Sequence, residues 1–164
     1  MQEGDRAGLR FRQGQQLSAN TKSVPGLGDG KPFTMSITFT LEDKPTGAMS
    51  GLYQAMAYMQ SGFRLVIGQN MKPNVELYYG PNQAKYLAGK TTLELGRTYE
   101  LTMTFDGQQG RLYLDGKLDG VIDAPPPPAY NGDLMVGNAG GANYHLTGVI
   151  YNLKFYALGV GQNK

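Results

Sequence analysis

Residues 96–120 read GRTYELTMTFDGQQGRLYLDGKLDG and carry the clearest fold signal in the chain. Between Tyr99 and Phe105 apolar side chains alternate with polar ones, which is the pattern of a strand with one face in a core. Two turn signals, Asp106-Gly107 and Asp115-Gly116, separate this segment from the apolar alternations that follow. The stretch therefore predicts three consecutive antiparallel strands.

The same alternation recurs along the chain, most regularly in Phe33–Leu41. Clusters of Gly, Pro, Asn and Asp separate the segments, in keeping with 24 glycines and 9 prolines among the 164 residues. We predict one all-β domain over residues 1–164, with a short helical turn near Ser18–Lys22 and an exposed, stiff loop at Pro125–Pro128. Further strands are expected at Gly8–Arg12, Leu52–Gln60, Phe63–Gly68, Val75–Tyr79, Lys85–Ala88, Lys117–Ile122, Leu134–Gly137 and Tyr144–Ala157.

The closing segment, Tyr144–Ala157, does not keep one alternating register. Val149-Ile150 and the later pair Leu153 and Phe155 fall out of phase with each other. One extra residue in a strand shifts the phase in this way, so the sequence predicts a β-bulge between them.

Composition excludes several classes of function. The 15 basic and 13 acidic residues are scattered and give a net charge of +2, which lacks the basic stripe of a nucleic-acid binder. No apolar run is long enough to insert into a membrane. Cysteine is absent, which removes disulfides and thiolate chemistry. The polar start Met1–Asp5 shows no leader, so the chain is either cytoplasmic or a piece from which a leader has been removed.

Several motifs occur in an order typical of one superfamily. A "Y-x-D-G" hairpin is followed by a strand ending in glycine, a Gly/Asn loop and a closing strand, after the opening stretches GLRFRQGQQLSA and GKPFTMSITFTL. The residues that carry this pattern are Tyr113, Asp115, Gly116, Leu134, Val136, Gly137, Gly148, Ile150, Leu153, Phe155 and Tyr156. Taken together they resemble the laminin-G-like branch of the concanavalin A-like lectin/glucanase superfamily. The resemblance implies a two-sheet antiparallel jelly-roll sandwich in which Leu9-Phe11 pairs beside Val149–Tyr156.

Some members of that family bind a structural calcium ion through acidic side chains. Here Tyr151-Asn152 and Arg12-Gln13-Gly14 stand where the family often has acidic residues, which puts that site in doubt. No other cofactor is expected. Asp29, in the turn-like Gly28-Asp29-Gly30, is the one candidate metal ligand for Ca²⁺, and a plain turn aspartate is the favoured interpretation.

Catalytic groups are not evident. Glycosidases of this fold need paired carboxylates on one strand face, and the E-x-D-x-x-E run of the glucanase branch is absent. Asp119 and Asp123 are interpreted as solvated turn carboxylates. The single histidine, His145, is interpreted as a surface residue rather than part of a triad. The chain is therefore predicted not to be an enzyme.

Eleven tyrosines and no tryptophan suggest how a ligand could be bound. Tyr79, Tyr99 and Tyr156 are in phase with the core and are expected to pack there. Other polar and aromatic residues alternate away from it, and if their strands are neighbours in one sheet, Arg64, Glu76 and Tyr78 form an exposed patch on its outer face. A Gly/Asn-rich loop allows close approach to a ligand. The candidate ligand-binding residues are Arg64, Glu76, Tyr78 and Tyr113 on strands, and Asn138, Asn143, Tyr144 and His145 on the loop.

The favoured hypothesis is a non-catalytic carbohydrate-binding module of a secreted or cell-surface bacterial protein, with a glycan or polysaccharide as its partner. Two alternatives remain open. One is a laminin-G-like module that binds another protein or has a structural role, and the other is a minimal glycoside hydrolase or polysaccharide lyase.

Overall fold

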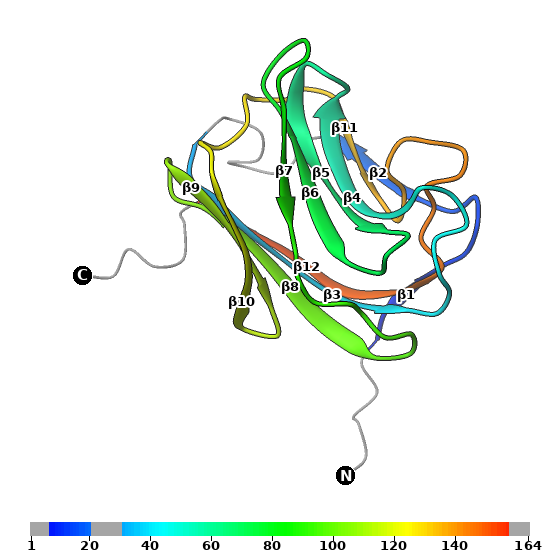
Figure 1. Cartoon of the computed structure of the whole chain (residues 1–164). Helices are drawn as coiled ribbons and strands as arrows, with labels where there is room; N and C mark the ends of the chain where they lie inside the picture. The colour runs from blue at the N-terminus through cyan, green and yellow to red at the C-terminus, as the bar shows by residue number, and fades with distance from the viewer. Residues whose placement is uncertain (1–6, 21–30, 158–164) are drawn as a thin grey trace.

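A computed structural model describes residues 7–20 and 31–157. These residues form twelve strands and no helix. They therefore contain no helix that could span a bilayer. Figure 1 shows two facing antiparallel sheets of six strands each. The first sheet has the order β1-β12-β3-β8-β9-β10 and the second the order β2-β11-β4-β5-β6-β7. The strands are β1 Leu9–Phe11, β2 Leu17–Asn20, β3 Phe33–Leu41, β4 Met49–Ala57, β5 Ser61–Gly68, β6 Pro73–Tyr78, β7 Ala84–Ala88, β8 Thr98–Phe105, β9 Gln109–Leu114, β10 Lys117–Asp123, β11 Asp133–Val136 and β12 Gly148–Tyr156.

This arrangement is the predicted two-sheet jelly-roll sandwich. The short helical turn expected near Ser18–Lys22 is wrong, because Ser18 lies in β2 and pairs with Met135 of β11. Thr21 and Lys22 lie outside the described residues. The sequence of residues 17–20 carries no clear strand pattern. This segment is stabilised as a strand by its pairing with β11.

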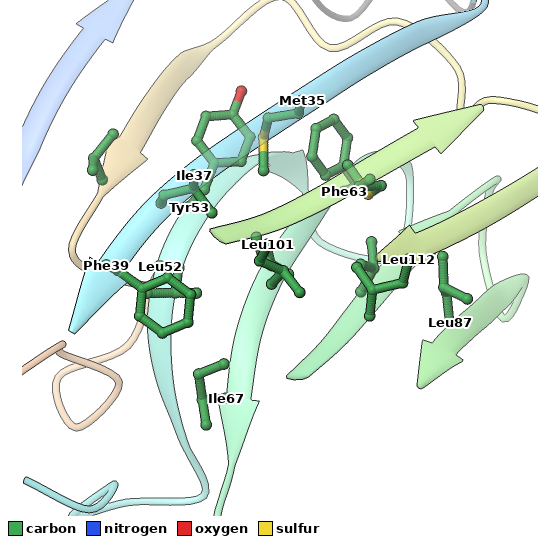
Figure 2. Close-up of a cluster of buried hydrophobic side chains, with 14 of the residues drawn as sticks. Met35, Ile37, Phe39, Leu52, Tyr53, Phe63, Ile67, Leu87, Leu101 and Leu112 are labelled. Atoms are coloured by element: carbon green, nitrogen blue, oxygen red, sulfur yellow. The ribbon is translucent and has the colours of Figure 1, made fainter. Parts of the chain in front are cut away.

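The core lies between the sheets and is filled by every second residue of the central strands. Met35, Ile37 and Phe39 of β3 are fully buried, and so are Leu65 and Ile67 of β5 on the facing sheet. Figure 2 shows inward side chains of both sheets in one cluster, among them Met35, Ile37 and Phe39 of β3 and Ile67 of β5. The period of two therefore fixes which face of each strand is committed to the core.

The two predictions about the chain's closing strand are confirmed. β12 pairs antiparallel with β1 and β3, which places the first and last described strands side by side. Its register against β3 shifts between Ile150 and Asn152, which is the expected bulge.

A buried carboxylate helps to close one side of the sandwich, where β10 lies near β7. Asp119 of β10 accepts hydrogen bonds from the Lys90 backbone N at 3.1 Å, the Thr91 backbone N at 3.0 Å and the Thr91 hydroxyl at 2.6 Å. The interpretation of Asp119 as a solvated turn residue is therefore wrong. Its partners lie 28 and 29 residues earlier in the chain, a separation that local patterns do not reveal.

Two further expectations fail at the edges of the fold. Pro126 and Pro127 are buried, although Pro125 and Pro128 are exposed as predicted. Tyr156 is 47% exposed on β12, whereas Tyr99 is buried and Tyr79 packs partly against the core as expected. Tyr156 is the last residue of β12 and lies beyond the bulge. Because a bulge shifts the alternation of the strand by one residue, the core residues before the bulge do not predict which way Tyr156 faces.

We expect Asp119→Ala to lower the free energy of unfolding by about 2–4 kcal/mol, because two backbone N–H groups and a hydroxyl lose their shared charged acceptor. Urea denaturation at fixed pH measures the change. Asp123→Ala is the matched control, since Asp123 is exposed on the same strand, and it should cost less than about 1 kcal/mol. Equal losses in the two variants would contradict the assigned role of Asp119.

Candidate functional site

The outward face of the second sheet carries a row of polar side chains. Cross-strand register pairs Gln54 of β4 with Arg64 of β5, Arg64 with Glu76 of β6, and Glu76 with Tyr86 of β7. Directly paired residues in antiparallel strands point to the same face. Because their neighbours Leu65 and Leu77 fill the core, this row, here called the Arg64 row, lies on the side away from it.

A salt bridge joins the centre of the Arg64 row. The Nε and a terminal nitrogen of Arg64 contact Oε2 of Glu76 at 2.7 and 2.6 Å. The Tyr78 hydroxyl donates to the same oxygen at 2.6 Å. Three donors on one carboxylate oxygen fix all three side chains relative to one another.

The sequence correctly predicted that Arg64, Glu76 and Tyr78 share one outward patch, but it wrongly predicted that the patch is exposed. Their exposed fractions are only 8%, 6% and 1%. Burial, followed by the hydrogen bond to Glu76, raises the pKa of Tyr78 above its ordinary value. Tyr78 therefore stays protonated and serves as a hydrogen-bond donor.

The cover over this patch comes partly from the second candidate region, the loop of residues 138–145. A terminal nitrogen of Arg64 donates to the Ala139 carbonyl at 3.0 Å, and the guanidinium carbon lies 5.9 Å from the centroid of the Tyr144 ring. The Gly51 backbone N on β4 donates to the Tyr144 carbonyl at 2.9 Å. Two candidate regions that the sequence treated separately are thus one continuous site.

Glycine at position 51 is what lets the loop lie so close to the sheet. A Cβ added to Gly51 would stand 2.1 Å from the Ala139 backbone N, which leaves no room for any side chain. Close backbone approach of this kind is a common reason for a glycine inside a strand.

The loop candidates differ in what they can offer to a ligand. Asn138 is buried and has a structural role, because it accepts from the Gly140 backbone N at 3.0 Å and donates to Gln16 at 2.7 Å. Asn143 is exposed, whereas Tyr144 and His145 are half-buried. His145 forms an isolated bridge with Asn138, and its Nδ1 has no hydrogen-bond partner within the described part of the chain.

Two candidates from the sequence do not join this site. Tyr113 lies on β9 of the first sheet, where it pairs with Thr102. Asp29 lies outside the described residues, so its role as a calcium ligand stays a prediction. Residues 7–20 and 31–157 bring together no group of three or more acidic or histidine side chains that could hold a metal ion.

Two exposed tyrosines of the site were missed by the sequence analysis. Tyr58, 66% exposed, follows β4, and its ring centroid lies 5.6 Å from that of the buried Tyr78 at an interplanar angle of 57°. Tyr86, 58% exposed, is the outermost member of the Arg64 row. Alternation with the inward Leu87 could have placed Tyr86 on an outer face, but only the register shows that it stands beside Glu76.

The Gln54 end of the Arg64 row contains a buried polar atom. Gln54 is buried, and its Oε1 has no hydrogen-bond partner among the described residues. Gly140 of the loop lies directly over this amide, since a Cβ at Gly140 would be 2.6 Å from Oε1. The end of the row beneath the loop thus retains an unused acceptor.

Comparison with known proteins agrees with this architecture. Residues 12–159 match the family described as the concanavalin A-like lectin/glucanases superfamily, a laminin-G family. The chain belongs to this superfamily. No curated protein sequence matches it.

Solved structures extend the superfamily likeness at low sequence identity. The carbohydrate-binding module CBM40 of the Ruminococcus gnavus IT-sialidase, bound to α2,3 sialyllactose, has a TM-score of 0.69 at 15% identity, with 98% of this chain and 96% of that chain covered. Domains LG4-5 of the mouse laminin α1 chain give a TM-score of 0.73 at 10% identity, with 98% of this chain and 44% of that chain covered. A Trypanosoma rangeli sialidase gives 0.57 at 22% identity, with 80% of this chain but only 21% of that chain covered. At these identities the likeness shows the shared fold alone, a two-sheet sandwich.

Within this superfamily fold, the buried ion pair should be a strong local determinant of stability. We expect Glu76→Gln to lower the free energy of unfolding by about 3 kcal/mol or more, because the buried Arg64 guanidinium loses its counter-charge. Urea or thermal denaturation followed by circular dichroism measures the loss.

The exposed pair Arg10–Glu42 supplies the control, since its side chains are 57% and 33% exposed at an N–O distance of 3.1 Å. Glu42→Gln should cost less than about 1 kcal/mol. The role given to the Arg64–Glu76 pair would be refuted by a Glu76→Gln variant as stable as the wild type.

Proposed function

We propose that this chain is a non-catalytic carbohydrate-binding module whose ligand rests on Tyr58 and Tyr86. The observation that carries the proposal is the placement of these two exposed rings next to the buried Arg64, Glu76 and Tyr78 cluster. Sugar rings present apolar C–H faces and peripheral hydroxyls. A tyrosine meets both with its apolar ring and its polar tip.

The cluster beneath these rings acts as a rigid support. Tyr58 packs on Tyr78, which is held by Glu76, which is in turn held by Arg64. Tyr86 lies beside Glu76 on a paired strand. A surface that is already ordered loses little conformational entropy on binding. This raises the affinity for a ligand such as an oligosaccharide, whose individual contacts are weak.

The charges of the site argue against hydrolysis. Retaining glycosidases need two carboxyl groups about 5–5.5 Å apart. The Arg64 row contains one carboxylate, Glu76, and the oxygen that accepts from Arg64 also accepts from Tyr78. A carboxylate engaged in this way is a poor nucleophile or proton donor, which supports a binding role.

The fold likeness to the sialidase CBM40 module, which was solved with a sialylated trisaccharide, also supports glycan binding. A module that binds polysaccharide would work where polysaccharide is found, so the proposal includes a parent bacterial protein that is secreted or displayed on the cell surface.

Protein binding is the second candidate, and one specific feature favours it. Leu9 of β1 and Leu17 of β2 are exposed, and both line an apolar cavity at the edge of the sandwich whose wall also includes the buried side chains of Phe11, Val136 and Ile150. Apolar surface of this kind is common at sites of protein contact. This region lies at the opposite sheet edge from Tyr86, so the two candidates can be tested separately.

Affinity electrophoresis in gels containing individual polysaccharides tests the proposed function. We expect retardation by at least one polysaccharide, and Tyr58→Ala and Tyr86→Ala should each weaken binding about tenfold because a stacking surface is lost. Tyr156→Ala is the matched control, since Tyr156 is similarly exposed but lies on the first sheet. Its binding should equal that of the wild type.

A lack of retardation by every polysaccharide would contradict the proposal. Light scattering coupled to gel filtration then tests protein binding, because a stable homo-oligomer that is broken by Leu9→Asp or Leu17→Asp would favour the second candidate.

A further inference from the structure

The charge balance of the site restricts the class of glycan, and this inference rests on the proposed function. In the strands of the second sheet the basic residues are Arg64 and Lys85. An acidic sugar bound beside Tyr58 and Tyr86 would be stabilised by a cation, because an isolated anion loses solvation when it leaves water, and the candidates on the strands are these two basic residues.

Each of the three guanidinium nitrogens of Arg64 already has a partner within the protein. Its Nε and one terminal nitrogen contact Glu76, and its other terminal nitrogen donates to the Ala139 carbonyl at 3.0 Å. The Arg64 side chain is 10% exposed. A carboxylate ligand would have to reach a guanidinium that is largely removed from water and whose charge is already balanced by Glu76 on the neighbouring strand.

Lys85 does not face the site. It pairs with the inward residue Leu77, on the opposite side of the strand from Tyr86. Its Nζ donates to the Asp123 carbonyl at 3.1 Å and lies 6.0 Å from the centroid of the Tyr79 ring. The ammonium group is therefore directed toward β10 and away from the Arg64 row.

Among the described residues of the site, the groups left for a ligand carry no permanent charge. They are the exposed rings and hydroxyls of Tyr58 and Tyr86, the exposed amide of Asn143 and the half-buried rings of Tyr144 and His145. Hydroxyl groups are the natural partners of amides and phenols, whereas a carboxylate would find no opposite charge among them.

We infer that this site binds a neutral glycan and that Arg64 is a support for the site rather than a receptor for an acidic sugar. Selectivity arises because Arg64, the cation of the Arg64 row, is neutralised by Glu76 within the protein. The chain therefore differs in ligand class from the structurally similar CBM40 module, which was solved with sialyllactose, an acidic oligosaccharide. Two proteins of the same fold can bind ligands of different charge, because function depends on the side chains that the fold presents.

Isothermal titration calorimetry with two ligand panels tests this inference on the full chain. The neutral panel contains hexasaccharides of β-linked glucose, xylose and mannose, and the acidic panel contains α2,3 and α2,6 sialyllactose and hexagalacturonate. We expect the tightest ligand to be neutral, with an association constant that changes less than about twofold between roughly 20 and 500 mM NaCl, since no ion pair forms.

Two variants sharpen the result. Tyr86→Ala should reduce the affinity for the best neutral ligand about tenfold. Lys85→Gln removes a charge from the position next to Tyr86 on the same strand. This variant should keep the affinity for that ligand within about twofold of the wild type, because Lys85 faces away from the Arg64 row.

The possible outcomes separate the two proposals. Tightest binding by an acidic glycan, weakened by salt or by Lys85→Gln, overturns the neutral-ligand inference and leaves carbohydrate binding intact. If neither these panels nor the polysaccharide gels show binding, the proposed function itself is contradicted. A neutral ligand whose affinity is unaffected by Tyr86→Ala overturns the location of the site.

Discussion

The register between neighbouring strands of the second sheet is the constraint on which both the core and the candidate site depend. Leu65, Val75 and Leu87 are paired across β5, β6 and β7, and all three are buried in the core. Their alternate neighbours must then be paired on the other face, which aligns Arg64 and Glu76. A slip of one residue would exchange the two faces, so hydrophobic burial in the core also holds the polar row in place.

The outward face of this sheet is not an ordinary solvated surface. Loop residues 138–145 lie against it, and the Arg64–Glu76 ion pair is largely removed from water. Burial of two charges is tolerated because several hydrogen bonds meet at one carboxylate oxygen. The result is an electrically balanced base with exposed aromatic rings at its margin, and the proposal of an uncharged, hydroxyl-rich ligand rests on this arrangement.

Sequence patterns predicted much of this arrangement and failed at identifiable places. Alternation correctly grouped Arg64, Glu76 and Tyr78 on one outward face, and the phase change in the closing strand correctly predicted a bulge. The exposure of the patch was predicted wrongly, because the cover over Arg64 comes from a loop about 75 residues further along the chain. Asp119 was misread for the same reason, since its hydrogen-bond donors belong to a distant segment.

By itself, the sequence determined that the chain is an all-β sandwich and which face of most strands turns inward, because side-chain direction in a strand alternates with a fixed period of two. It also placed the chain in its superfamily. Only the tertiary structure decided that the loop at residues 138–145 packs on the Arg64 row and that Tyr58 and Tyr86 remain exposed beside it. Exposure depends on contacts between segments far apart in the chain, and a local pattern holds no information about them.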